Sequence, residues 1–442
     1  MSFLKRLFKN NDSQPAVPEV RFGRYSDSYK ETENYKAWDQ AVEAFEEKQY
    51  LDSLRAFLRY LYDEHQDNVH WQDNGESIQF ELCQGSKLIQ GFADALHIKA
   101  ESKVAKVKDL DVAFMRRLVE HNFDNLYSRY ALDPDNNITV VFDTFTLDGS
   151  PYKIYHALKE MATHADKQDD LLLDEFDSLE PISSATLMPV PDAEKQTKYD
   201  YICGEIDAAL RVMGDGRLDT NQYPGGIGYL LLCLVYKLDY LTQPQGFMME
   251  TLERVHRLYF TNDGKNTAQK NLALAKELQT LRQRSQTLFY KEMYRTSATF
   301  GITSPVNHRH IAGFIESELP NMDWYYENGH AEVALSVPGY IAGYCLFNYA
   351  PPRPVKDLLH LYFQITEADF FKELGFPAAL FEPETGVFHK KAIRQAIEDI
   401  VTKNRERFHL QPDMSILQWN DLPTFARSLL AMLARMEVDM RV

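Results

Sequence analysis

Few residues in this chain have the types and spacing of a reactive site. His308 and His310 stand two apart at a predicted helix start, so they would point to different sides and lack a third metal ligand. The segment Asp133-Pro-Asp-Asn-Asn137 begins like a calcium-binding loop, but its sixth position is Ile138 instead of Gly and its twelfth is Thr144 instead of Glu. We therefore expect surface histidines and a hairpin turn at these positions.

The remaining chemical signals are isolated from one another. The cysteines, Cys83, Cys203, Cys233 and Cys345, stand alone in apolar surroundings without a CxxC pair, which predicts buried free thiols in a reducing cytoplasm. Pro224-Gly-Gly-Ile-Gly228 follows no predicted strand and lacks the GK[ST] ending of a phosphate-binding loop, so it predicts a helix start. The sequence contains no GxSxG or HExxH motif. We expect no enzymatic activity, no cofactor and no bound metal.

Composition sets the class of protein. A chain of 442 residues with 44% hydrophobic residues is long enough for two or three globular domains. Its 48 basic and 65 acidic residues give a formal charge of −17, which disfavours nucleic-acid binding because that binding depends on Lys and Arg neutralising phosphates. The acidic run at 166–180 would in principle hold a divalent cation, although a solvated helix face explains it equally well.

The segment from residue 112 to 176 has the clearest secondary-structure signals. Helical spacing predicts a helix from Asp111 to Asn122 and another that begins at Ser150-Pro151, an N-cap followed by a residue suited to the first turn. The face of the first helix that we expect to be buried consists of Val112, Met115, Leu118 or Val119, Asn122 and Leu126. The buried positions expected in the intervening strand and the second helix are Ile138, Val140, Phe142, Ile154, Leu158, Met161 and Ala165.

The preceding residues predict helices followed by strands. Helical periodicity at 33–62 is interrupted near Gln49, which fits two short helices or one kinked helix. Strands are predicted at 69–71, 77–82 and 89–99, with Asn-Gly as a hairpin turn between the first two. The first 180 residues therefore predict the order α-β-β-β-α-β-β-α.

This order resembles the small α+β fold of the type III secretion chaperones and the related YbjN family. The likeness covers residues 34–179 and includes a helix ending in His121-Asn122, an aromatic-rich strand from Tyr127 to Asp133, a hairpin, and a helix with Ala165-Asp166 near its end. The resemblance implies a non-enzymatic, homodimeric protein, and the secretion chaperones in this group bind extended segments of other proteins. This chain departs from them in being about three times as long.

A second, diverged copy of the fold is predicted near the C-terminus. Trp71-Gln-Asp-Asn-Gly75 has a counterpart in Tyr325-Tyr-Glu-Asn-Gly329, and Ile89-Gln-Gly-Phe92 has one in Ile341-Ala-Gly-Tyr344 at similar spacing. The copy would extend over 306–408. Coincidence among common turn signals is the alternative explanation.

These signals divide the chain into five segments. We expect a tail at 1–33, a chaperone-like α+β domain at 34–180, a linker at 181–197, a helical domain at 198–304 and a second chaperone-like α+β domain at 305–442. The fold class is therefore α+β, with two such domains flanking a helical middle region. A chain that contains two copies would pair them internally, which predicts a monomer with an internal pseudo-dimer.

The function expected from this organisation is chaperone-like binding of another protein. Aromatic residues on exposed sheet faces would supply the contact surface, because aromatic side chains dominate interface energetics. The candidates are Trp71, Phe92, Trp324, Tyr325 and Tyr344, and the alternative is that these rings fill the domain cores. Two other functions stay open: an enzyme or small-ligand binder with a site in the helical middle region, and a membrane-edge scaffold anchored by residues 1–10, which are basic and amphipathic.

Overall fold

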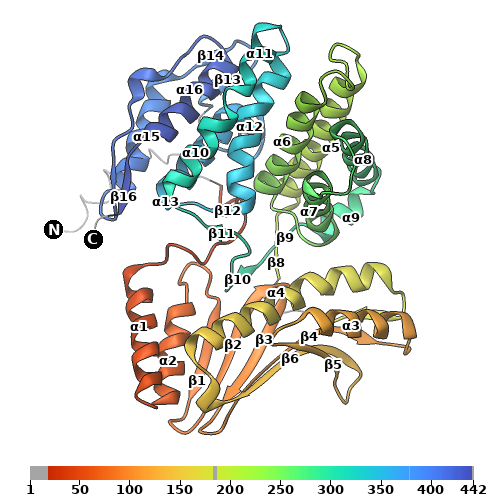
Figure 1. Ribbon diagram of the computed structural model, residues 1–442, viewed down its shortest axis with the longest axis vertical. Coiled ribbons are helices and arrows are strands. Elements are labelled where there is room, and N and C mark those ends of the chain that lie inside the picture. Colours follow the sequence, from red (N-terminus) through yellow and green to blue (C-terminus); the bar gives the residue numbers. More distant parts are fainter. Residues whose placement is uncertain (1–17, 183–186, 378, 441–442) are drawn as a thin grey trace, which may run out of the picture.

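The computed structural model describes residues 18–182, 187–377 and 379–440, and these form two parts of different architecture (Figure 1). An α+β part precedes a larger, mainly helical part, so the α+β class is confirmed at this level. The first ten residues, the candidate membrane anchor, lie outside the described residues.

The α+β part is built on one antiparallel sheet. Its elements are α1 (Thr32–Glu46), α2 (Tyr50–Leu61), β1 (Val69–Asp73), β2 (Ile78–Gly85), β3 (Lys87–Ala93), β4 (His97–Val107), α3 (Val112–Asp124), β5 (Arg129–Leu132), β6 (Asn137–Phe145), α4 (Pro151–Glu175) and β7 (Leu179–Pro181). The main path of the sheet runs β1-β2-β3-β4-β6-β5, and β7 adds to β4. The strand predicted at 89–99 is two strands, because the Asp94 carboxylate accepts hydrogen bonds from the N–H groups of Leu96 and His97 and closes a turn.

Helix α4 packs against one face of this sheet and forms the core with it. The Ser150 hydroxyl accepts a hydrogen bond from the Lys153 N–H at 3.3 Å, and Pro151 occupies the first turn, so the predicted helix start is confirmed. All seven positions predicted to be buried in β6 and α4 are buried. The hairpin predicted at 133–137 is also confirmed, with the Asp133 carboxylate accepting from the Asn137 N–H at 2.8 Å.

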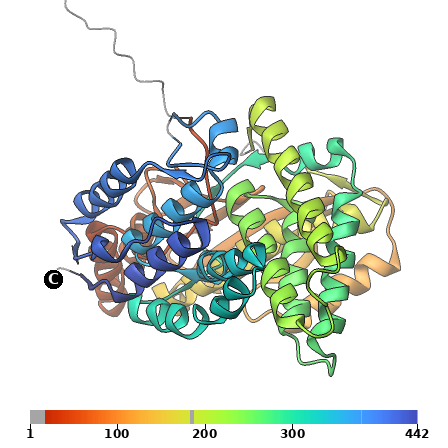
Figure 2. The same cartoon turned by 90° about the horizontal axis from the view of Figure 1, so that it is seen from above.

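The second part consists of helices packed around one shared core. They are α5 (Asp192–Gly214), α6 (Pro224–Thr242), α7 (Gly246–Phe260), α8 (Thr267–Arg282), α9 (Gln286–Lys291), α10 (His308–Glu318), α11 (Asn321–Glu327), α12 (Ala331–Asn348), α13 (Arg353–Thr366), α14 (Ala368–Glu373), α15 (Lys390–Asn404) and α16 (Leu422–Arg435). Figure 2 shows the helices before and after residue 300 side by side. Helices α6 and α12 touch closely: a Cβ at Gly339 would lie 2.5 Å from the Cys233 Sγ.

Strands in this part are short. They are β8 (Met188–Pro189), β9 (Tyr294–Arg295), β10 (Ser297–Ala298), β11 (Ser304–Pro305), β12 (Tyr349–Ala350), β13 (Phe381–Glu382), β14 (Val387–Phe388), β15 (Phe408–Leu410) and β16 (Val438–Met440). Of these, β10 joins the large sheet by pairing with β2.

The predicted second α+β copy at 306–408 is wrong. Tyr325 to Gly329 covers the end of α11 and the turn after it, and Ile341 to Tyr344, the expected strand, lies inside α12. Residues 333–347 are apolar almost all round, and a short apolar run does not distinguish a buried helix from a buried strand. Residues 305–440 share one hydrophobic core with the helices that precede them, so no separate domain begins at 305 in the described residues.

Residues 18–31 connect the two parts. Gly23 donates its N–H to the Tyr240 carbonyl at 2.7 Å with a φ of +68°, and a side chain there would collide with the Tyr240 ring. The buried Arg24 guanidinium pairs with Asp239 at 2.7 Å and Glu253 at 3.1 Å. The α+β part is therefore held to α6 and α7 by hydrogen-bonded backbone and a buried ion pair.

Replacing Leu158 by Ala should lower the free energy of unfolding by about 2–5 kcal/mol, because its side chain is fully buried between α4 and the sheet. Leu147→Ala is the matched control, since Leu147 is 62% exposed, and it should change this free energy by less than about 0.5 kcal/mol. Urea denaturation measures both. Equal effects of the two substitutions would contradict the packing of α4.

Candidate functional site

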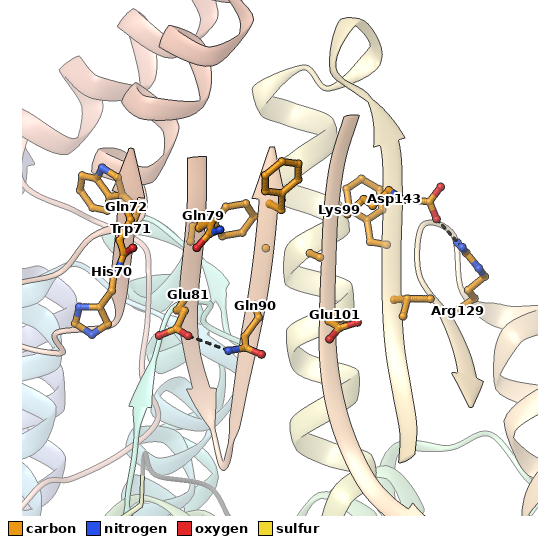
Figure 3. A pocket seen from close by; sticks show the side chains of 16 residues that line it. His70, Trp71, Gln72, Gln79, Glu81, Gln90, Lys99, Glu101, Arg129 and Asp143 are labelled. Atoms are coloured by element: carbon orange, nitrogen blue, oxygen red, sulfur yellow. Dashed lines mark hydrogen bonds and ion pairs between the residues drawn. The ribbon is translucent and has the colours of Figure 1, made fainter. Parts of the chain in front are cut away.

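The face of the sheet opposite α4 forms a shallow hollow of about 900 Å³ (Figure 3). Alternation along the strands places its lining out of phase with the core: in β2, Ile78 and Phe80 are buried, whereas Gln79 is exposed. The polar residues that line the hollow are His70, Gln72, Gln79, Glu81, Gln90, Lys99, Glu101, Arg129 and Asp143.

Several of the polar side chains of this hollow pair with their neighbours. The Gln90 amide donates to Glu81 at 2.9 Å, and Arg129 donates to Asp143 at 2.5 Å, as the dashed lines in Figure 3 mark. These pairs join adjacent strands and do not converge on one point. The hollow therefore has the polar surface usual for the solvent face of an antiparallel sheet.

Two of the five aromatic candidates border the hollow, but strand alternation directs them to opposite faces, because Trp71 pairs with the buried Phe80 and Phe92 with the exposed Gln79. Trp71 and Phe92 both line the hollow, and each is 37% exposed. Trp324, 42% exposed, stacks on Tyr223 in the helical part, and Tyr325 lies half-buried against Gly226. The last candidate packs inside the helical part: Tyr344 stacks on Phe314 with 4.8 Å between ring centroids. The five rings do not form one surface.

Helix α3 presents an apolar face that was not predicted from the sequence. Its buried side is formed by Phe114 and Leu118, which are 0% and 4% exposed. Three large apolar residues on the other side and Leu126, two residues past the end of the helix, are exposed. They are here called the α3 apolar face: Val112 (83%), Val119 (66%), Phe123 (91%) and Leu126 (83%). The predicted phase of this helix is therefore correct only in part. Leu118 is buried and Met115 and Asn122 are half-buried as predicted, whereas the prediction was wrong for Val112, Val119 and Leu126.

The error has a physical cause in the sequence. Apolar residues follow helical spacing on both sides of α3, so periodicity alone does not decide which side is buried. The missed signal is Phe114, which lies one turn before Leu118 and was not among the positions expected to be buried.

Polar contacts at the end of α3 fix its orientation. The Asn122 side chain accepts from the Tyr130 N–H at 2.6 Å and donates to the Tyr130 carbonyl at 3.2 Å. Glu160 of α4 accepts from the N–H groups of Leu126, Tyr127 and Ser128 at 2.8–3.0 Å. Both contacts hold the buried side of α3 toward the sheet.

The electrostatics of Glu160 follow from these bonds. Burial by itself would raise the pKa of its carboxyl, but the three backbone N–H groups and the Ser128 hydroxyl lower that pKa below its ordinary value. The carboxylate is therefore stabilised in its charged form by the loop that it holds.

Other functional features predicted from the sequence have these outcomes. All four cysteines are free and buried, as predicted. Pro224 to Gly228 begins α6, which confirms the predicted helix start.

Within the described part of the chain, no three His, Cys, Asp or Glu side chains are grouped to hold a metal ion. None of the helices described has both the length and the apolar character needed to span a bilayer.

Comparison with known proteins adds no functional assignment. No protein-family model and no curated protein matches this chain. Function is therefore inferred from the geometry of the molecule.

Glu160→Gln should lower the free energy of unfolding at pH 7 by about 1–3 kcal/mol, because a neutral amide accepts these hydrogen bonds less strongly and directs an NH₂ group at donors. The pKa of Glu160 is lowered by folding, so its contribution is full above the unfolded pKa and is lost as pH falls through the folded pKa. The difference between wild type and variant should therefore shrink below about pH 4.5. Denaturation from pH 3 to 7 measures it, and a difference independent of pH would contradict this role.

Proposed function

We propose that this protein is a non-enzymatic, chaperone-like protein that binds another protein through the α3 apolar face. The observation that carries the proposal is the exposure of Phe123, at 91%, between Val119 one turn before it and Leu126 just past the end of the helix. Contiguous apolar patches on a soluble protein mark interaction sites, because leaving them in water is costly. Burial of a side chain such as Phe123 would contribute about 1.5–3 kcal/mol to binding.

The chemistry of the face defines its partner. Val112, Val119 and Phe123 recur on one side of this 13-residue helix, a pattern that suits an amphipathic helix lying along α3. Arg116 and Glu120 pair with each other at 2.9 Å, and Arg117 pairs with Glu175 of α4 at 3.4 Å. We infer a partner helix that is recognised through its apolar face.

The order of elements from α1 to α4 supports a chaperone-like role. Two helices, four strands, one helix, two strands and a final helix follow the order that suggested the resemblance to the secretion chaperones and the YbjN family, except that one of the three strands expected first is two strands. The reason for expecting an internal pseudo-dimer no longer holds, because the described residues contain one such unit. A chain without an internal copy to pair with is consistent with a surface that binds a separate protein.

Capture experiments with surface variants test the proposal. The wild type, Phe123→Asp and the matched control Phe92→Ser serve as bait in lysate from the native cell. Both substituted side chains are exposed, so each variant should keep the wild-type free energy of unfolding within about 0.5 kcal/mol. We expect a stoichiometric protein partner that the wild type and Phe92→Ser retain and that Phe123→Asp loses.

Three results would contradict the proposal. Loss of the partner with Phe92→Ser but not with Phe123→Asp would place the contact in the sheet hollow. Retention by both variants would exclude both surfaces. Sedimentation velocity of the purified chain supplies the third: a dimer abolished by Phe123→Asp, without another captured protein, would make α3 an interface between copies.

A further inference from the structure

The helical part encloses a cavity of about 400 Å³ between α5, α6, α12 and α13. Much of its wall is apolar and comes from Ala209, Leu230, Leu234, Leu335 and Phe363. Cavities of this size with apolar walls and a few polar groups are typical of small-molecule sites. The cavity lies in the helical part, whereas α3 belongs to the α+β part, so a ligand site here is independent of the proposed protein binding.

A charged cluster lies at one end of this cavity. Lys237 of α6 pairs with Glu205 of α5 at 2.5 Å and with Glu367, at the end of α13, at 3.2 Å. The Tyr201 hydroxyl donates to Glu367 at 2.8 Å. The Lys237 and Glu367 side chains are only 14% and 16% exposed, so the three charges come from separate elements into a largely dry site.

The charges of the cluster do not balance. Two carboxylates share one ammonium group, which leaves one negative charge in surplus. Burial raises the pKa of Glu367, and the attraction of Lys237 offsets this only in part. Burial would lower the pKa of Lys237, but the two carboxylates raise it above its ordinary value, so the ammonium stays charged.

The rest of the lining leaves that surplus in place. The other charged residues on the wall are Arg211, Arg217, Asp215 and Glu332, two of each sign. With all of these carboxyls ionised, the lining of the cavity therefore carries one net negative charge.

Stability alone does not account for this arrangement. A buried ion cluster costs several kcal/mol of desolvation per charge, and apolar residues of similar size often stabilise a fold as well or better. An unbalanced ion cluster that faces a cavity with apolar walls instead matches the needs of a ligand.

We propose that this cavity binds a small organic monocation, an amine or amidine with an apolar body. Its cationic head donates hydrogen bonds to Glu205 and Glu367 and balances the surplus charge. Its apolar body lies against the leucines and Phe363.

Three compounds of matched size test this site on the full chain: tryptamine, its neutral analogue tryptophol and the anion indole-3-acetate. Isothermal titration calorimetry should show saturable tryptamine binding below about 1 mM, with tryptophol at least about tenfold weaker and indole-3-acetate weaker still. Tryptophol or indole-3-acetate binding as tightly as tryptamine would overturn the proposal. So would the absence of saturable tryptamine binding.

Variants locate the binding. Glu205→Gln keeps the pair of Lys237 with Glu367 and should weaken tryptamine binding by about tenfold or more. Asp200→Asn, an exposed carboxylate on the same helix, is the control and should leave the affinity unchanged. Equal affinities of wild type and Glu205→Gln would overturn the site. If the Glu205→Gln variant does not fold, the comparison of the three compounds on the wild type still tests whether the protein prefers a monocation.

Discussion

The side of α3 that meets the sheet is decided by two polar contacts at its end. Asn122 pairs with the backbone of Tyr130, and Glu160 binds three successive N–H groups after the helix. Because these groups would be costly to leave unpaired, the helix is not free to rotate about its axis. Phe114 and Leu118 are thereby turned inward and the α3 apolar face outward. A polar constraint therefore produces the apolar surface to which we assign protein binding.

The two parts of the molecule divide the proposed roles. The α+β part presents the surface, and the helical part encloses the cavity. They are joined by residues 18–31, in which Arg24 is buried between Asp239 and Glu253, and by β10, which extends the large sheet. A buried guanidinium with two carboxylate partners is costly to separate, so the parts are expected to move as one body.

Local signals in the sequence were sufficient for some elements and not for others. Ser150-Pro151 and the regular stripe after it predicted α4 correctly, because a capping residue fixes where the helix begins and a single apolar face fixes which side is buried. For α3, apolar residues on two sides left two possible buried sides. The contacts of Asn122 and Glu160 with backbone outside the helix determine which of them is buried. For α12, the residues are apolar on all sides of the helix, so the sequence shows no helical periodicity there. Common glycine spacings then suggested a repeat that the structure does not contain in the described residues. The cavity was not predictable, because Glu205, Lys237 and Glu367 meet only through the packing of distant helices.

Hydroxyl-radical footprinting of the chain tests most directly whether a partner covers α3. Oxidation of Phe123 and Phe92 is measured in the free protein and in the complex isolated with its partner. We predict that Phe123 is oxidised readily in the free chain, as its 91% exposure requires, and is protected in the complex, while Phe92 is unchanged. Protection of Phe92 with full oxidation of Phe123 would contradict a binding role for α3.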